Sequence, residues 1–423
     1  MMDRNCKTTI AAKSTPKLAM LPGLIVALLA SDPSIAQDGA ISARWNEGEL
    51  VITGTNRDDQ ITVAAEDGVI YVNSGLVEVA GGLPLLAETS LIKVAGLGGD
   101  DLIALNEWQA HLPDSELDGG DGNDILFSGA GNDVLIGGAG GDYLAGNAGN
   151  DTVEGQDGSD LLIVNNGDGS DFLEGGKGDD TLQIQGRLSE RDEIELRSDG
   201  SVIFVSDALP AGLDSSVQTI ETVRVNGRGG DDRISAELLA ADVAQLELDG
   251  GEGNDLLIGG DGVDVLRGGA GNDTLLGNRG NDIVLGQDGN DLLIVNNGDG
   301  SDFLEGGPGD DLAQLFGADD GADDIQIVPA KNRVRIEGTA PANFTIDLSE
   351  VETLDVNGQG GSDVIIGSVG LNGLVSLNLD GGEGNDLLIG GDGADVLNGG
   401  PGRRDLCERN GGSDRLISCE KVQ

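Results

Sequence analysis

The most regular feature of the sequence is an aliphatic residue that recurs every nine positions between runs of glycine and polar residues. From Gly119 the chain reads GGDGNDILF, SGAGNDVLI, GGAGGDYLA, GNAGNDTVE and GQDGSDLLI, then an 11-residue variant, VNNGDGSDFLE, and GGKGDDTLQ. The shared pattern is G-G-x-G-x-D-x-U-x, in which U is Leu or Val in every clear copy except the one at Ala313. The first six residues favour a turn, and the last three favour a short strand whose U side chain points to one face.

One aliphatic side chain per strand, always in the same phase, is what a narrow solenoid interior requires. Two nonapeptides then make one coil with a turn on each side. Stacked coils place equivalent turns above one another, so their aspartates converge. The alternative is a flexible linker rich in Gly, Asn and Asp. A linker, however, has no need of an aliphatic residue or an aspartate at one fixed phase.

A longer period of 131 residues organises the whole chain. Gly119 recurs as Gly250 and Gly381, and the stretch 155–180 recurs almost unchanged at 286–311. The chain therefore holds two complete units and a truncated third, each with a spacer followed by a nonapeptide block. The spacers alternate like β-strands and show no long helical pattern, so we expect few helices. The predicted segments are a signal peptide (1–36), a β-rich N-terminal spacer (37–118), block 1 (119–183), a β-rich spacer (184–249), block 2 (250–314), a β-rich spacer (315–380), and a truncated block 3 with a C-terminal cap (381–423).

The first 36 residues follow the pattern of an export signal. A basic start precedes an apolar stretch at 18–30, which is too short to span a bilayer comfortably, and Ser34-Ile35-Ala36 offers a small-residue cleavage site. A buried helix is the weaker interpretation because Pro22 and Gly23 interrupt the stretch. We expect cleavage before Gln37 and a secreted, extracellular protein, with the periplasm or the cell surface as alternatives. No later segment resembles a transmembrane helix.

The composition is strongly acidic, with 76 acidic against 24 basic residues, a net charge of −52 and only 2% aromatic residues. Such a chain ordinarily stays disordered, because it buries too little apolar area to offset its conformational entropy. A compact fold therefore requires something that neutralises the carboxylates. The same charge repels nucleic acid and anionic membranes, so nucleic acid is excluded as a partner.

The aspartate of each nonapeptide is the candidate metal ligand. Ca²⁺ takes six to eight oxygen ligands from carboxylates and carbonyls, and glycine turns expose carbonyls. Thiolate and imidazole are missing from the repeats, which disfavours zinc and copper, and Mg²⁺ demands a tighter octahedron. We therefore expect several Ca²⁺ ions along the blocks. The candidate ligands are Asp124, Asp133, Asp142, Asp151, Asp160, Asp171, Asp180, Asp255, Asp264, Asp273, Asp282, Asp291, Asp302, Asp311, Asp386 and Asp395.

The nonapeptides GGDGNDILF, GGAGGDYLA, GGEGNDLLI and GGAGNDTLL resemble the hemolysin-type calcium-binding repeats of RTX (repeats-in-toxin) proteins. The resemblance implies an all-β, right-handed parallel β-roll with Ca²⁺ held between successive turns by the sixth-position Asp and by turn carbonyls. The ending also resembles the degenerate last repeat of such chains. There Arg404 takes the ligand phase and Asp405 falls one position later, so Asp405 is not counted as a ligand. Many RTX proteins use an uncleaved C-terminal export signal, and this chain departs from them with its N-terminal one.

Two cysteines follow the predicted cleavage site, Cys407 and Cys419. An exported chain meets an oxidising compartment, so we predict that they form a disulfide, with two free thiols as the alternative. Two cysteines and one distant histidine make a poor structural zinc site, which needs four ligands.

The sequence offers little to support catalysis. His111 is the only histidine and has no nucleophile-and-base constellation nearby. No His-Glu-x-x-His, Gly-x-Ser-x-Gly or phosphate-binding Gly-Lys-Ser/Thr motif is present. Paired carboxylates could mimic a glycosidase dyad, but sugar sites usually need aromatic platforms, and the tryptophans are limited to Trp45 and Trp108. We therefore predict that the protein is not an enzyme.

The leading functional hypothesis is a secreted calcium-binding scaffold that external Ca²⁺ stiffens. An adhesin or matrix protein that binds surfaces or glycans through its β-rich spacers is the alternative. A cryptic carbohydrate-active enzyme on a β-solenoid is a third hypothesis, disfavoured because no carboxylate cluster is flanked by aromatics or arginines.

Overall fold

The computed structural model describes residues 41–422 apart from 108, 208–213, 242 and 341–342. The predicted signal peptide and its cleavage site lie outside the described residues. Ile41–Gln423 forms one compact unit. It is built almost wholly of strands, and its only helical segments among the described residues are two short 3-10 turns, η1 (Asn73–Gly75) and η2 (Leu86–Glu88). The expectation of an all-β chain with few helices is confirmed.

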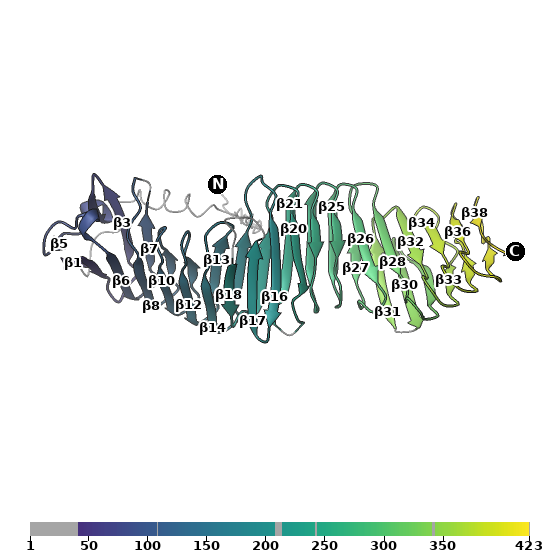
Figure 1. Ribbon diagram of the computed structural model, residues 1–423, viewed down its shortest axis with the longest axis horizontal. Coiled ribbons are helices and arrows are strands. Elements are labelled where there is room, and N and C mark those ends of the chain that lie inside the picture. The colour runs from purple at the N-terminus through teal and green to yellow at the C-terminus, as the bar shows by residue number, and fades with distance from the viewer. Residues whose placement is uncertain (1–40, 108, 208–213, 242, 341–342, 423) are drawn as a thin grey trace, which may run out of the picture. The chain divides into compact units, whose positions relative to one another are not determined.

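Two long sheets, dominated by parallel pairing, carry all the strands (Figure 1). The first sheet contains β1 (Ser42–Asn46), β2 (Glu49–Thr53), β5 (Val79–Ala80), β6 (Leu91–Gly98), β8 (Ser115–Asp121), β10 (Val134–Ala139), β12 (Thr152–Asp157), β14 (Phe172–Lys177), β16 (Glu193–Asp199), β17 (Val202–Asp207), β18 (Asp214–Gln218), β20 (Arg233–Leu238), β22 (Leu256–Ile258), β24 (Thr274–Leu276), β26 (Leu292–Asn296), β28 (Leu312–Phe316), β32 (Thr353–Asn357), β34 (Ser376–Asp380), β36 (Val396–Asn398) and β38 (Arg415–Ile417). The second sheet contains β3 (Gln60–Glu66), β4 (Val69–Val72), β7 (Leu102–Asn106), β9 (Ile125–Phe127), β11 (Tyr143–Ala145), β13 (Leu161–Asn165), β15 (Thr181–Gln185), β19 (Thr222–Asn226), β21 (Gln245–Glu252), β23 (Val265–Ala270), β25 (Ile283–Asp288), β27 (Phe303–Glu305), β29 (Asp324–Ala330), β30 (Arg333–Ala340), β31 (Phe344–Ser349), β33 (Val364–Gly367), β35 (Leu387–Ile389), β37 (Leu406–Glu408) and β39 (Lys421–Val422).

Within the blocks, successive strands alternate between the two sheets, and each coil therefore uses two nonapeptides. Leu117 of β8 pairs with Leu135 of β10 in the first sheet, and Leu126 of β9 pairs with Leu144 of β11 in the second. Partners are 18 residues apart, as the hydrogen bonds between equivalent turns also show. The parallel register confirms the predicted coil of two nonapeptides.

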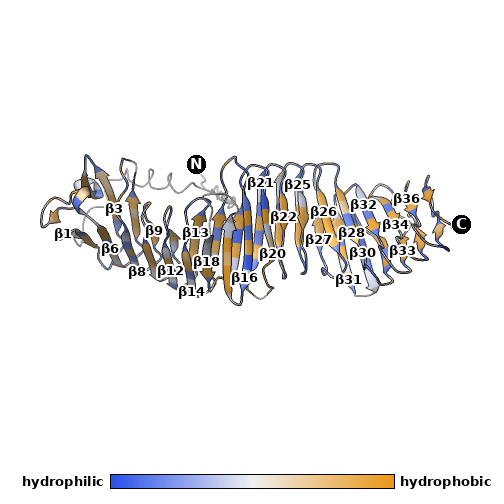
Figure 2. Cartoon of the chain, in the orientation of Figure 1, coloured by the Kyte–Doolittle hydropathy of each residue, from blue (hydrophilic) through white to orange (hydrophobic). Residues whose placement is uncertain are grey.

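The core is a narrow double row of aliphatic side chains between the two sheets. Every U residue of the nonapeptides points inward and is at most 3% exposed, including Leu135, Leu266 and the small exception Ala313. Most residues on either side of U are more exposed than U, so hydrophobic and polar positions alternate along many strands (Figure 2). Most block strands contribute one such aliphatic side chain and the longer strands β13, β15, β26 and β28 contribute two, so the interior is narrow, which limits how much the hydrophobic effect can contribute.

The spacers continue the same solenoid. Strands β6 and β20 of the spacers pair in parallel with β8 and β22 beside them. Each of the later two spacers adds an antiparallel insertion, β16–β17–β18 in the first sheet and β29–β30–β31 in the second. The solenoid is therefore continuous where the spacers meet the blocks, and the division into these segments stays a prediction.

Equivalent strands of successive 131-residue units lie in opposite sheets. Strand β8 belongs to the first sheet, its counterpart β21 to the second, and the next counterpart β34 to the first again. This alternation arises because one coil crosses both sheets, and each 131-residue unit contains an odd number of such crossings. As a result, a turn at one edge of the solenoid in one unit has its counterpart at the other edge in the next.

Candidate metal centre

The nonapeptide turns can stack closely because they carry glycine where a side chain would collide with the neighbouring coil. Gly120 and Gly122 have φ angles of 106° and 144°, which L-residues with a Cβ rarely adopt. A methyl group on Gly122 would run into the carbonyl of Gly99 in the preceding coil. The close approach brings the aspartates of successive coils within hydrogen-bonding distance of one another.

The aspartates form ladders along the two edges of the solenoid. The turns that precede strands of the second sheet lie along one edge of the solenoid, which we call the first edge. The turns that precede strands of the first sheet lie along the other edge, which we call the second edge. Along the first edge, the Asp124 N–H donates to Oδ1 of Asp142, and the Asp142 N–H donates to Oδ1 of Asp160, both at 2.8 Å. The same bond links Asp133 to Asp151 at 2.8 Å on the second edge.

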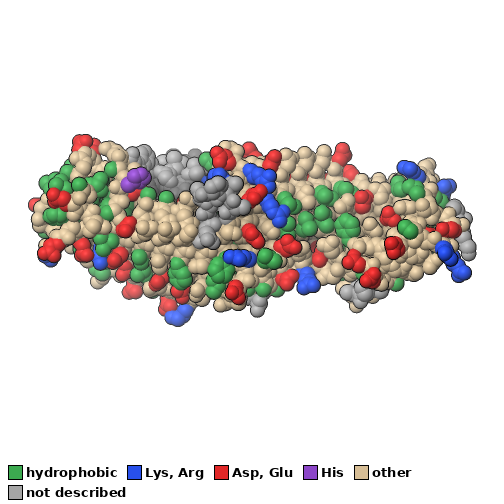
Figure 3. All heavy atoms as spheres, in the orientation of Figure 1, with side chains coloured by type: hydrophobic (Ala, Val, Ile, Leu, Met, Phe, Trp, Pro, Cys, Tyr) green, Lys and Arg blue, Asp and Glu red, His purple; other side chains and the backbone are tan. Residues whose placement is uncertain are grey.

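All of the predicted ligands lie in these ladders, and each is at most 6% exposed. The first edge carries Asp124, Asp142, Asp160, Asp180, Asp264, Asp282, Asp302 and Asp386, and the second carries Asp133, Asp151, Asp171, Asp255, Asp273, Asp291, Asp311 and Asp395. Figure 3 shows many acidic side chains on the face in view, but the ladder aspartates are buried and do not account for them.

The second carboxylate oxygen, Oδ2, is buried without a hydrogen-bond partner among the described residues at most ladder positions. This holds at Asp101, Asp124, Asp133, Asp142, Asp151, Asp160, Asp180, Asp232, Asp255, Asp273, Asp282, Asp291, Asp311, Asp363, Asp386, Asp395, Asp405 and Asp414. A buried, unpaired carboxylate oxygen is costly, because it has left water without a replacement partner.

At many of these positions the unpaired Oδ2 borders a small space that a carbonyl oxygen of the next coil also borders. In the turn of Asp124, a methyl group on Gly119 would contact Oδ2 of Asp124 and would lie 2.7 Å from the carbonyl oxygen of Gly137 in the next coil. In the turn of Asp255, a methyl group on Gly250 would meet Oδ2 of Asp255 and the Gly268 carbonyl in the same way. We call this space, bounded by the first glycine, the ladder Oδ2 and the carbonyl of the next coil, the cradle. Its hard oxygen donors fit Ca²⁺ rather than a metal that prefers nitrogen or sulfur.

Burial shifts the acidity of the ladder. It raises the pKa of Asp151 and Asp282 to about 8, and that of Asp142 and Asp273 to about 7. The backbone N–H that each Oδ1 accepts acts against this shift, and the charges of the adjacent ladder carboxylates add to it. The buried column therefore favours a proton or a cation over bare negative charge.

Asp264 differs from the other predicted ligands because its Oδ2 is already paired. It opens its ladder, and the Gly260 N–H donates to this oxygen at 2.8 Å. Its carboxylate is thus stabilised by the backbone of its own turn.

The ladders extend beyond the predicted residues into the spacers and the cap. The additional members are Asp59, Asp101, Asp192, Asp232, Asp323, Asp363, Asp405 and Asp414, with Glu221, Glu352 and Glu420 accepting the last bond of three ladders. A sequence signal marks Asp101, Asp232 and Asp363 as ladder members. Each ends the turn of a degenerate nonapeptide, G-x-G-G-x-D-x-I-x, whose second glycine has been replaced.

Asp405, which is not counted as a ligand from the sequence, nevertheless lies in the ladder. The Asp386 N–H donates to Oδ1 of Asp405 at 3.0 Å, and Asp405 is fully buried. The turn before it absorbs the extra residue, so that Leu406 still pairs in register with Leu387. Arg404, which holds the expected ligand phase, is exposed.

Cys407 and Cys419 form a disulfide, as the sequence predicts, with Cα atoms 5.9 Å apart. Cys407 is buried in the core and pairs with Leu388 of β35. The bond therefore ties the last turn of the chain to the interior of the solenoid.

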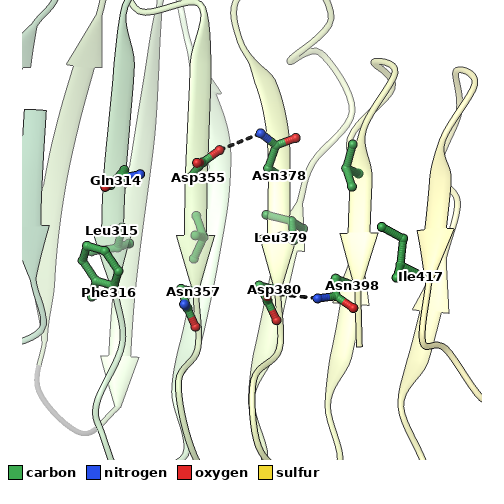
Figure 4. Close-up of a pocket in the computed structure, with 12 residues that line it drawn as sticks. Gln314, Leu315, Phe316, Asp355, Asn357, Asn378, Leu379, Asp380, Asn398 and Ile417 are labelled. Atoms are coloured by element: carbon green, nitrogen blue, oxygen red, sulfur yellow. Dashed lines mark hydrogen bonds between the residues drawn. The ribbon is translucent and has the colours of Figure 1, made fainter. Parts of the chain in front are cut away.

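A shallow depression of about 310 Å³ lies over β28, β32, β34 and β36 (Figure 4). Two registered rows of side chains line it. Gln314, Asp355 and Asn378 form one row, and Phe316, Asn357, Asp380 and Asn398 form the other. Asn378 donates to Asp355 at 2.6 Å and Asn398 donates to Asp380 at 3.0 Å, so these polar groups partly satisfy one another.

The described part of the chain offers little support for a metal site made of side chains alone or for a catalytic histidine. No group of three or more His, Cys, Asp or Glu side chains there converges on a metal position, as expected if the cradles depend on backbone carbonyls. The side chain of His111 is 86% exposed and contacts Glu107. Among the residues that the structure describes, none lies in a helix with the length and hydrophobicity of a membrane span.

Comparison with known proteins identifies the repeats. The sequence model of the RTX calcium-binding nonapeptide repeat matches residues 114–135, 136–168, 165–183, 247–275, 258–293, 296–325 and 378–406. No curated protein matches the chain. Among solved structures, the chain is similar to the extracellular lipase LipA from Serratia marcescens, with 21% sequence identity and a TM-score of 0.16 over 60% of this chain and 43% of that one, so it spans less than half the length of the lipase. The chain carries RTX calcium-binding nonapeptide repeats in several copies along its length.

Proposed function

We propose that the protein is an exported calcium-binding scaffold whose cradles take up Ca²⁺ along both edges of the solenoid. One observation carries the proposal: the Oδ2 atoms of successive ladder aspartates are buried and unpaired, and many of them border the same small space as a carbonyl oxygen of the next coil. A divalent cation would supply the missing partner and the missing positive charge.

The residues that would hold each ion come from two adjacent coils. In block 2 these are Asp255 with the Gly268 carbonyl, and Asp273 with the Gly286 carbonyl, 2.7 Å from a methyl group placed on Gly268. Because the donors come from different coils, the ion joins coils that the chain alone holds by backbone bonds and one or two aliphatic side chains per strand. Binding and folding are therefore coupled, since the unfolded chain has no preformed site.

The scaffold assignment rests on what the repeats do and on the lack of catalytic groups in the sequence. The repeated residues are those that make turns, core and ladders. The lone histidine is solvent-exposed and its contact is Glu107. We propose accordingly that the protein is not an enzyme. Its export is proposed from the basic, apolar and small-residue order of residues 1–36.

Equilibrium dialysis of the mature chain against Ca²⁺ tests the proposal. We expect several ions per chain to bind cooperatively at about 10⁻⁴–10⁻³ M, as in extracellular modules. An equal concentration of Mg²⁺ should displace few of them, because Mg²⁺ retains its waters. A chain that binds no Ca²⁺ at millimolar concentration would contradict the proposal.

The depression over β28, β32, β34 and β36 favours a second role, the binding of a glycan. Its parallel rows of amide and carboxylate groups lie beside the ring of Phe316 (Figure 4). Such groups match the hydroxyls and apolar face of a sugar. Glycan-array binding by the Ca²⁺-saturated chain, lost in an Asn357→Ala/Asn378→Ala variant, would support this role. A parent chain that binds no glycan would end it.

A further inference from the structure

The spacers contain carboxylates in the same setting as those of the nonapeptide blocks. Asp101, Asp232 and Asp363 lie outside the segments that match the repeat model. Each is at most 2% exposed, and each has an Oδ2 without a partner among the described residues. Their Oδ1 atoms accept the N–H of the preceding ladder aspartate at 2.7–2.8 Å, as in the blocks.

The oxygen cradle is also present at these positions. A methyl group on Gly227 would contact Oδ2 of Asp232 and lie 2.6 Å from the Gly250 carbonyl oxygen, which belongs to the first turn of block 2. Gly96 has the same relation to Asp101 and the Gly119 carbonyl, at 2.5 Å. Gly358 has it to Asp363 and the Gly381 carbonyl, at 2.8 Å. Each spacer cradle therefore borrows its carbonyl from the first glycine of the following block.

Four other ladder carboxylates have the same glycine and next-coil carbonyl beside them but differ in that their Oδ2 is not free. Asp59, Asp192, Asp264 and Asp323 each open a ladder, and each has its Oδ2 paired with a backbone N–H of its own turn, from Thr55, Arg187, Gly260 and Ala318 respectively. At Asp192 the Arg187 guanidinium also donates to Oδ1 at 2.8 Å. A side-chain cation thus already neutralises this carboxylate.

We propose that Asp101, Asp232 and Asp363 bind Ca²⁺ at the junction of each spacer with the following block, and that Asp59, Asp192, Asp264 and Asp323, whose Oδ2 is paired, do not. This inference rests on the proposed function, because it extends the same chemistry to residues outside the repeats. The free Oδ2 beside a glycine carbonyl, rather than the nonapeptide motif, decides which carboxylates take an ion. The spacer sites make each block continuous with the coil before it.

The test is the number of Ca²⁺ ions bound at saturation by the full mature chain. The variant Asp101→Asn/Asp232→Asn keeps the size of both side chains and the Oδ1 acceptor but removes two charges. We expect it to bind at least two fewer ions than the parent. The matched control, Asp100→Asn/Asp231→Asn, removes the same charge from the adjacent exposed positions. Asn123 holds that position one coil later and accepts the Gly141 N–H at 2.9 Å, so asparagine is compatible with the turn. The control should keep the full number of ions.

A second pair of variants separates this inference from the proposed function. Asp124→Asn/Asp142→Asn alters two block ligands and should also lose ions. If it loses them while Asp101→Asn/Asp232→Asn retains the full number, the spacer sites are refuted and the calcium scaffold stands. If the parent chain binds no Ca²⁺, both fail.

Crystallography of the parent chain grown with Ca²⁺ provides a measurement that does not depend on how the variants fold. We expect anomalous density beside Gly96, Gly227 and Gly358, and none beside the Oδ2 atoms of Asp192 and Asp264. Density in the block cradles alone would overturn the inference.

Discussion

The two oxygens of each ladder carboxylate have different tasks. Oδ1 accepts the N–H of the preceding ladder aspartate and so aligns the turns, as at Asp273, which accepts from Asp255 at 2.8 Å. Oδ2 is left for the cradle. Replacement of the acid by its amide retains the first task and weakens the second.

We predict that Asp273→Asn raises the Ca²⁺ concentration needed to order block 2 about tenfold, which corresponds to roughly 1.4 kcal/mol. Hydrogen exchange at subsaturating Ca²⁺ should quicken in β24 and β26 but not in β9 and β11, because coils contact only their neighbours. Asp288→Asn, an exposed change in the same block, is the control. Equal effects of the two changes would count against a specific role for the ladder.

The raised pKa values predict how the metal-free chain responds to pH. Free aspartate has a pKa near 3.9, whereas burial raises the pKa of Asp151 and Asp282 to about 8 in the fold. The fold thus binds more protons than the unfolded chain between these values, and its stability falls as pH rises. In EDTA, the β-structure should be greater at pH 5 than at pH 8 by circular dichroism. With Ca²⁺ at a limiting concentration, low pH should instead weaken ion binding, because the ligands must be deprotonated. A metal-free β signal that rises with pH would contradict this account.

At the scale of the element, the last coil needs support that the other coils receive from neighbours on both sides. The disulfide between Cys407 and Cys419 closes a loop over a sequence separation of 12, for which the chain-entropy model gives about 3 kcal/mol. We predict that Cys407→Ala/Cys419→Ala speeds hydrogen exchange in β36–β38 while block 1 is unchanged. The intact parent should be about 2 Da lighter than its reduced form, the mass of two hydrogens lost on pairing. Alkylation of both cysteines without reductant would exclude the bond.

The block coils could be predicted from sequence because each nonapeptide encodes its own turn and strand. The phase of Leu135 and Asp133 sets the side that each faces, and the register then follows from stacking. The spacers lack such a local rule. Alternation in β16 and β30 indicates strands but does not tell whether they add coils or antiparallel insertions, because both patterns have a period of two.

The candidate site was predicted where the motif is intact and missed where it is degenerate. Asp101 was overlooked because Leu97 replaces the second glycine, although Leu97 adopts the same positive φ, 83°. Asp405 was excluded because of an inserted residue that the turn accommodates. Asp264 matches the motif, yet the pairing of its Oδ2 depends on the local path of the Gly260 backbone, which spacing alone does not determine.

At the scale of the whole molecule, export should precede calcium uptake. We predict that the mature protein begins at Gln37, because Ser34-Ile35-Ala36 ends the apolar stretch with a small-residue site. N-terminal sequencing of the protein recovered from its native source checks this. A mature cellular form that retains Met1 would refute it.

The molecule combines a net charge of −52 with ladders of buried carboxylates on both edges and a narrow core to which each block strand gives one or two aliphatic side chains. Over the described ranges of the chain, few side-chain cations neutralise the ladder carboxylates. Asp192 is a position where one does, because Arg187 pairs with it. The fold as a whole should therefore depend on a cation from solution.

The most direct test of this claim is far-UV circular dichroism of the mature chain at pH 8, first with EDTA and then with excess Ca²⁺. We predict a largely unfolded spectrum in EDTA and a strong β signal on addition of Ca²⁺, with little recovery in the same concentration of Mg²⁺. An equal β signal in EDTA and in Ca²⁺ would show that the ladders do not need the ion and would contradict the account.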